Sequence, residues 1–150
     1  MRKLVTLFAL GAVAALVFAA LSSARPAAGM FRLSATLTAA QEIPKQVVKN
    51  QAAHGAFTGT LSGTHLKWKL TFVKLTGPAT GAHIHLGVMG KSGNVAVPLC
   101  GPCKSGMTGT ATISASLLAK IEKHATYVNV HTAKNPNGEI RGQLVAKSGA

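Results

Sequence analysis

Three histidines of this chain have the spacing of ligands for a transition metal. His83 and His85 stand two positions apart within residues 82–86, and His131 closes residues 127–131. If both segments are β-strands, residues two apart point to the same side, so one strand offers two imidazoles and a paired strand adds the third. Three imidazoles on one face suit copper or zinc. We therefore take His83, His85 and His131 as candidate metal ligands.

Polar residues at the same spacing extend this candidate site. Asn129 lies two positions before His131, and Glu139 and Arg141 alternate within residues 138–144. Glu139 is a candidate fourth ligand or an outer acceptor for an imidazole N–H. In a second interpretation the histidines hydrogen-bond to Asn129, Glu139 or the backbone, Glu139 pairs with Arg141, and the face is a structural polar network without metal. Contact with a small ligand or a carbohydrate is a third interpretation.

A metal-dependent enzyme is a further alternative, but the sequence favours a protein without catalytic activity. It contains no Gly-x-Ser-x-Gly elbow and no phosphate-binding loop. Glu42, Glu122 and Glu139 do not form a convincing pair for glycoside hydrolysis. Glu42 is interpreted instead as a residue that fixes the turn before Pro44, which restricts Ile43 to extended geometry.

Cys100 and Cys103 form the Cys-Gly-Pro-Cys sequence that also occurs in thioredoxin active sites. There the motif opens a helix after a strand, and the helix N-terminus lowers the pKa of the first thiol. Here it is followed by residues 104–106, Lys-Ser-Gly, which are typical of a loop between strands. We expect a local disulfide in an oxidising compartment. A redox or soft-metal site is the alternative.

The first residues have the layout of a secretory signal peptide. Arg2 and Lys3 precede an apolar stretch, residues 4–21, which ends in small residues. An uncleaved anchor is the alternative, because this stretch is nearly long enough to span a bilayer, and it would be the chain's only membrane contact. We expect a secreted, periplasmic or envelope protein. We divide the chain into a signal peptide with an uncertain boundary (1–24), a short linker (25–30), a folded domain (31–146) and a tail (147–150).

The chain is strongly basic, with 16 Lys and Arg residues against 3 acidic residues and a formal net charge of +13. The lysines are scattered along the sequence with almost no aromatic residues between them. Recognition of nucleic acid needs a concentrated basic face with stacking or groove-entering elements, so we expect no nucleic-acid partner. The partners that remain are an unidentified protein or an anionic polymer of the envelope.

Alternation of apolar and polar residues predicts an all-β domain. The clearest strand is 64–73, where Leu66, Trp68 and Leu70 face one side, and residues 62–64 form the turn to its partner, 55–62. Short antiparallel strands of this kind predict a Greek-key β-sandwich, immunoglobulin-like or Cu,Zn superoxide dismutase-like, with one short helix. The other predicted elements are strands at 31–38, 82–87, 95–99, 108–114, 125–132 and 139–146, and a helix at 116–123 capped by Ser114 or Ser116.

Four motifs in this order resemble the CHRD domain, named after the animal developmental regulator chordin. They are QEIP at 41–44, AHIHLG at 82–87, YVNVHT at 127–132 and NGEIRGQ at 137–143. The resemblance covers about residues 31–146. It implies an exported binding or structural module of the cell envelope or extracellular space, in bacteria often a single domain behind a signal peptide, and it implies no known activity.

Residues 82–86 are also similar to the copper-binding strand of copper/zinc superoxide dismutases. Those enzymes need further histidines and an Asp to hold two metals, and this chain contains no Asp. We therefore do not expect dismutase activity.

Overall fold

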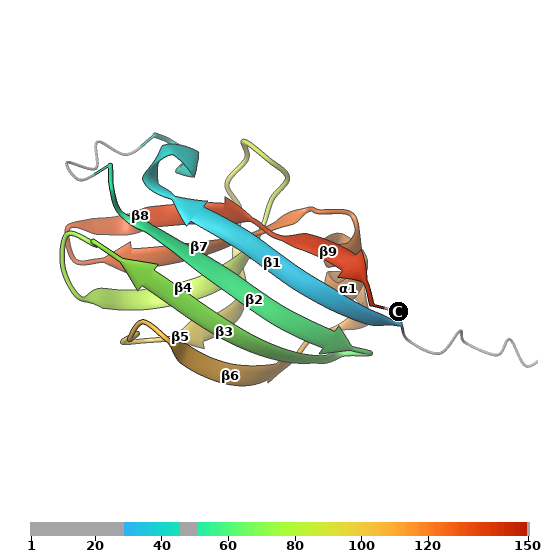
Figure 1. Cartoon of the computed structure of the whole chain (residues 1–150). Helices are drawn as coiled ribbons and strands as arrows, with labels where there is room; N and C mark the ends of the chain where they lie inside the picture. The colour runs from blue at the N-terminus through green and yellow to red at the C-terminus, as the bar shows by residue number, and fades with distance from the viewer. Residues whose placement is uncertain (1–28, 46–50, 150) are drawn as a thin grey trace, which may run out of the picture.

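The computed structural model describes residues 29–45 and 51–149 of the chain (Figure 1). The predicted signal peptide and most of the predicted linker lie outside these residues. Within the described part, no helix has the length and apolar character needed to cross a membrane.

The described residues form nine strands, one α-helix and one short 3-10 helix, so the predicted all-β fold with a single short helix is confirmed. In chain order the elements are β1 (Met30–Thr38), η1 (Ala39–Gln41), β2 (His54–Ser62), β3 (His65–Val73), β4 (Ala79–Leu86), β5 (Val95–Cys100), β6 (Met107–Thr112), α1 (Ala115–Glu122), β7 (Thr126–Thr132), β8 (Asn135–Gln143) and β9 (Val145–Ser148).

The strands make one antiparallel sheet in the order β5-β4-β7-β8-β1-β2-β3-β6, with β9 paired to β1. β8 and β1 share a single registered pair, Thr38 with Arg141, and the sheet folds over at this point. Figure 1 shows β1, β2, β3 and β6 in front and β4, β7 and β8 behind them. The result is a nearly closed, sandwich-like barrel.

The apolar core lies between the two layers. The alternating residues of the front strands and the inward residues of β4, β7 and β8 meet there, and each large side chain buried in this way contributes about 1.5–3 kcal/mol to stability. Fully buried contributors from these strands include Phe57, Leu37, Leu61, Leu66, Leu70, Ile84, Val128 and Ile140. Because inward residues alternate with outward ones, His83, His85, Asn129 and Arg141 lie on the other face.

The predicted strand over residues 139–146 is in fact two strands, β8 and β9. The side chain of Leu144 is fully buried, and its amide donates a hydrogen bond to the carbonyl oxygen of Thr126 at 3.0 Å. Beyond this residue the chain leaves β7 and pairs with β1, so that Val145 lies opposite Ser34. The sequence pattern does not reveal such a change of partner strand, because the alternation of inward and outward residues continues unbroken from β8 into β9.

Two local predictions agree with the structure. β2 and β3 form the predicted hairpin, and Gly63 in its turn has a φ of 58°, a conformation that favours glycine. The helix begins one residue earlier than predicted. Of its two candidate caps, Ser114 is the one used, because its Oγ accepts a hydrogen bond from the Leu117 amide at 3.2 Å.

Candidate metal centre

The polar segments singled out in the sequence lie side by side as β4, β7 and β8. His83 is paired with Asn129, and Asn129 is paired with Arg141 on the next strand. One step along the same strands, His85 is paired with Tyr127. These side chains share the face of the sheet that points away from the core.

His83, His85 and His131 form a compact cluster on this face. One ring nitrogen of each lies within 4.8 Å of the others. The ring centroids are 5.6 Å apart for His83 and His85, 5.0 Å for His83 and His131, and 5.8 Å for His85 and His131. Metal–nitrogen bonds of about 2.0–2.1 Å place ligand nitrogens about 3.3 Å apart, so small side-chain rotations would close the cluster around one ion.

Backbone carbonyl groups fix two of the three rings. His85 Nδ1 donates to the Gly93 oxygen and His131 Nδ1 to the Pro136 oxygen, each at 3.0 Å. Since a carbonyl oxygen only accepts, the neutral rings carry their proton on Nδ1 and their lone pair on Nε2. Nε2 of His85, Nε2 of His131 and Nδ1 of His83 are buried without a hydrogen-bond partner. Each histidine thus has one buried nitrogen available to a metal.

The cluster favours neutral imidazoles. Burial, with repulsion from His83 as the next cause, lowers the pKa of His131 to about 4. Burial also lowers the pKa of His83 and of His85. A metal ion binds the deprotonated ring nitrogen, so no proton has to leave the cluster at neutral pH.

Tyr127 and Arg141 support His85 from the neighbouring strands. The Tyr127 ring is stacked on the His85 ring, with centroids 4.9 Å apart and planes 10° apart. The Arg141 guanidinium lies 3.4 Å from the Tyr127 centroid and donates to the Lys91 oxygen at 2.7 Å. The Gly93 amide donates to the Tyr127 hydroxyl at 3.2 Å. These contacts attach the segment between β4 and β5 to the histidine face. Tyr127 is not among the residues predicted from the sequence, although it precedes Asn129 by the same two-residue step.

We expect Gly93→Ala to lower the free energy of unfolding by about 2 kcal/mol. A Cβ at this position would overlap the carbonyl group of Leu86, so the segment has to shift and move its own carbonyl away from His85 Nδ1. Urea unfolding measures the first effect, and the Nδ1–H signal of His85 in NMR spectra measures the second. Gly77→Ala is the control, because a Cβ there meets nothing within 4 Å. Equal losses in the two variants would contradict the expected role of Gly93.

Glu139 lies outside the histidine cluster. Its carboxylate accepts hydrogen bonds from the Thr76 amide at 2.6 Å, the Thr76 hydroxyl at 2.8 Å, the Thr132 hydroxyl at 2.6 Å and Asn135 Nδ2 at 3.0 Å. Its side chain is fully buried. Burial alone would raise the pKa of Glu139, but these hydrogen bonds outweigh it and lower the pKa. Glu139 therefore accepts from neutral donors, in place of the predicted imidazole or Arg141.

Glu42 is a buried acid, a position that the sequence pattern did not predict. It is only 1 % exposed, and its Oε2 accepts from Asn129 Nδ2 at 3.4 Å. Burial raises the pKa of Glu42 to about 7, against the opposing effects of the Asn129 hydrogen bond and the Arg141 charge. A signal was available, because the chain has only 3 acidic residues and Glu42 belongs to the first of the four motifs.

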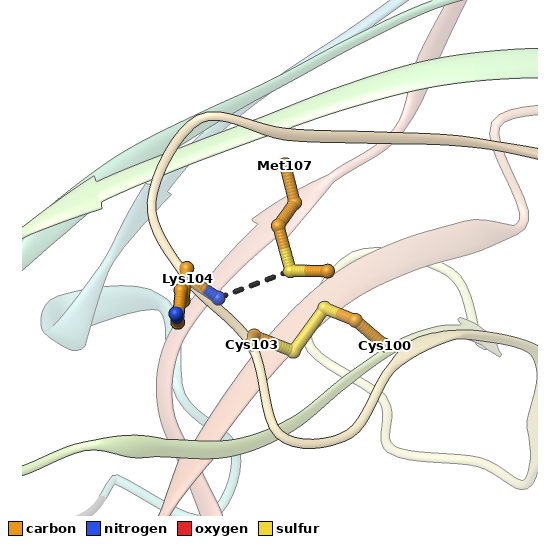
Figure 2. Close-up of a disulfide and its surroundings, with 4 residues drawn as sticks. All are labelled: Cys100, Cys103, Lys104 and Met107. Carbon is orange, nitrogen blue, oxygen red and sulfur yellow. Dashed lines mark hydrogen bonds between the residues drawn. A yellow bond between two sulfur atoms is a disulfide. The ribbon is translucent and has the colours of Figure 1, made fainter.

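Cys100 and Cys103 are joined by a disulfide at the end of β5 (Figure 2). The Cys103 amide donates to the Ala79 oxygen at 3.0 Å, which ties the loop to β4. Lys104 follows, and its amide contacts the Met107 sulfur at 3.1 Å. The chain continues into strand β6 rather than into a helix. The environment that activates a thioredoxin cysteine is therefore missing at this disulfide.

Comparison with known proteins gives one match. The family model of the CHRD domain matches residues 33–144. Searches of curated proteins and of solved structures returned no match.

Proposed function

Because this chain belongs to the CHRD domain family, we propose that it is an exported module that binds one copper or zinc ion through His83, His85 and His131. The family and the disulfide are those of a small extracellular-type module. The observation that carries the metal proposal is the convergence of three ligand nitrogens within 4.8 Å.

The hydrogen bonds favour a metal centre over a purely structural network. In a structural network the buried ring nitrogens are paired, because an unsatisfied buried polar atom costs about 1–3 kcal/mol. Here two rings are held through Nδ1 and every ring keeps one buried nitrogen without a partner. A metal ion would use all three lone pairs. The same carbonyl contacts would then orient the ligands, as outer partners of metal-bound histidines commonly do.

The ligand set favours copper. It consists of imidazoles alone, which suit both copper and zinc, and for a given set of nitrogen ligands Cu²⁺ binds more tightly than Zn²⁺. His83 and His131 are only half-buried, which leaves a side of the ion open to water or to a further ligand. The proposed activity is binding of the ion, with copper as the preferred metal.

The test is a titration of the purified mature domain with Cu²⁺ and Zn²⁺ in the presence of a competing chelator. We expect one equivalent of Cu²⁺ to bind, and His83→Ala/His85→Ala to lower the affinity at least 100-fold. Loss of a metal ligand should lower the affinity at least as much as loss of an outer hydrogen-bond partner, which lowers metal affinity about 10–100-fold. The matched control is His54→Ala/His65→Ala, because both residues are exposed and lie outside the cluster.

Circular dichroism shows whether each variant keeps its fold. A wild-type protein that binds no metal would contradict the proposal. Equal losses of affinity in the folded double variant and the folded control would contradict it too. Either result would leave a binding or structural module whose histidines serve the polar network.

A further inference from the structure

We propose that the outer face of β9, β1, β2, β3 and β6 binds an acidic polysaccharide. We call this surface the basic face, and it is the side turned toward the viewer in Figure 1. It belongs to the opposite layer of the barrel from the histidine cluster, so the inference does not depend on metal binding.

Cations lie next to one another on this face although they are scattered in the sequence. The strand register places Lys147 beside Arg32, and Lys67 two strands beyond Arg32 with Thr60 between them. Lys69 is the next outward residue along β3. All four cationic side chains are exposed. Neighbouring strands are about 4.8 Å apart and outward residues on one strand about 6.8 Å apart, so the positive charges recur at intervals of about 5–10 Å.

No carboxylate side chain balances these charges on the face. The chain has 3 acidic residues, and two of them, Glu42 and Glu139, are buried. The third, Glu122, lies in α1, which is behind the sheet in Figure 1. The protein therefore exposes many lysines and a single acidic side chain, and the basic face attracts anions without competition from its own residues.

Hydroxyl groups fill the positions between the cations. Thr60 and Thr110 flank Lys67 on the two neighbouring strands, and Thr58 and Thr108 flank Lys69 in the same way. The strands enclose a shallow groove of about 630 Å³ along these residues. Alternating ammonium and hydroxyl groups in an open groove match a chain that carries both carboxylate or sulfate groups and sugar hydroxyls.

The face lacks the groups that other polyanions require. Trp68 lies under the groove but is only 6 % exposed, and no Phe, Tyr or Trp side chain of the described residues is exposed. Bases of single-stranded nucleic acid bind by stacking on exposed aromatic rings. Insertion at a membrane surface likewise uses Trp, Phe or Leu. An acidic polysaccharide needs neither kind of group.

The test measures binding of polygalacturonate oligosaccharides to the mature domain by calorimetry in EDTA, with dextran as the uncharged comparison. We expect binding to polygalacturonate only, weakened as salt rises. Lys67→Gln/Lys69→Gln should lower the affinity at least tenfold. Lys120→Gln/Lys123→Gln is the matched control, because it removes the same charge from exposed positions in and next to α1, and it should change the affinity less than twofold.

The proposal would be overturned by equal binding to dextran, by no binding to polygalacturonate or by equal weakening in the two double variants. Tighter binding to RNA or to phosphatidylglycerol vesicles would overturn it too. His83→Ala/His85→Ala should bind the polysaccharide as the wild type does. A loss in that variant would place the polysaccharide at the histidine cluster instead of the basic face.

Discussion

Replacing His131 by leucine is expected to abolish tight copper binding and to make the metal-free protein less sensitive to acid. His131 supplies one of the three converging nitrogens, so its loss should lower Cu²⁺ affinity about 100-fold or more. The same substitution removes a buried ring nitrogen that has no hydrogen-bond partner in the metal-free protein. The variant should therefore lose copper affinity and, at the same time, no longer bear the energetic cost of a buried ring nitrogen without a partner.

The acid effect follows from the pKa of His131, which is about 4 in the fold against 6.5 ordinarily. Between these values the unfolded chain binds a proton that the folded protein does not bind. Stability therefore falls as the pH falls from about 6.5 toward 4. Leucine removes this contribution. Urea unfolding in EDTA at several pH values measures this effect. The free energy of unfolding of the variant, relative to that of the wild type, should rise as the pH falls through this range.

Glu42 opposes this dependence and has to be separated from it. Its pKa is raised from 4.5 to about 7, so between these values the folded protein holds a proton that the unfolded chain lacks. Its contribution to stability is fully present below pH 4.5 and is lost as the pH rises through 7. The wild-type curve contains the effects of Glu42, His131, His83 and His85, and the difference between His131→Leu and wild type gives the contribution of His131. Parallel pH curves, or unchanged copper affinity, would contradict the role given to His131.

The histidine cluster was predictable because strand geometry fixes which residues share a face. A spacing of two places His83 and His85 on one side of β4, and pairing with β7 brings His131 beside them. The segments that cover the face were not predictable in this way. The carbonyl groups of Gly93 and Pro136 fix two of the rings, and a backbone group leaves no mark on residue type or spacing.

The burial of Glu42 and the clustering of cations on one surface could not be predicted from the sequence either. Glu42 follows η1 and lies two residues before Pro44, a position that suggests an exposed turn, yet its side chain is buried and accepts a hydrogen bond from Asn129 of β7. The lysines form no run in the sequence, but antiparallel register places Arg32, Lys67 and Lys147 on one surface. Both features depend on which strands become neighbours, a global property of the fold that local patterns do not contain.

The largest loss of stability is expected for Glu139→Gln, at about 3 kcal/mol in the free energy of unfolding at pH 7. The carboxylate accepts four hydrogen bonds from Thr76, Thr132 and Asn135, all of which are donors. Glutamine replaces one acceptor oxygen by an NH₂ group, which faces those donors and cannot accept their hydrogen bonds. We also expect about a tenfold drop in copper affinity. Thr132 adjoins His131, and Asn135 adjoins Pro136, whose carbonyl oxygen holds the His131 ring.

Glu42→Gln is the matched control, since it makes the same change at the other buried acid. With a pKa of about 7, Glu42 is already about half neutral at pH 7, so glutamine should cost less than about 1 kcal/mol. The pKa of Glu139 is lowered, so its contribution is present above its ordinary value of 4.5 and is lost as the pH falls through the folded value. The deficit of Glu139→Gln should therefore shrink in acid. Urea unfolding of the two variants from pH 7 to pH 3 measures this, and equal deficits at pH 7 would show that the fold does not depend on the charge of Glu139.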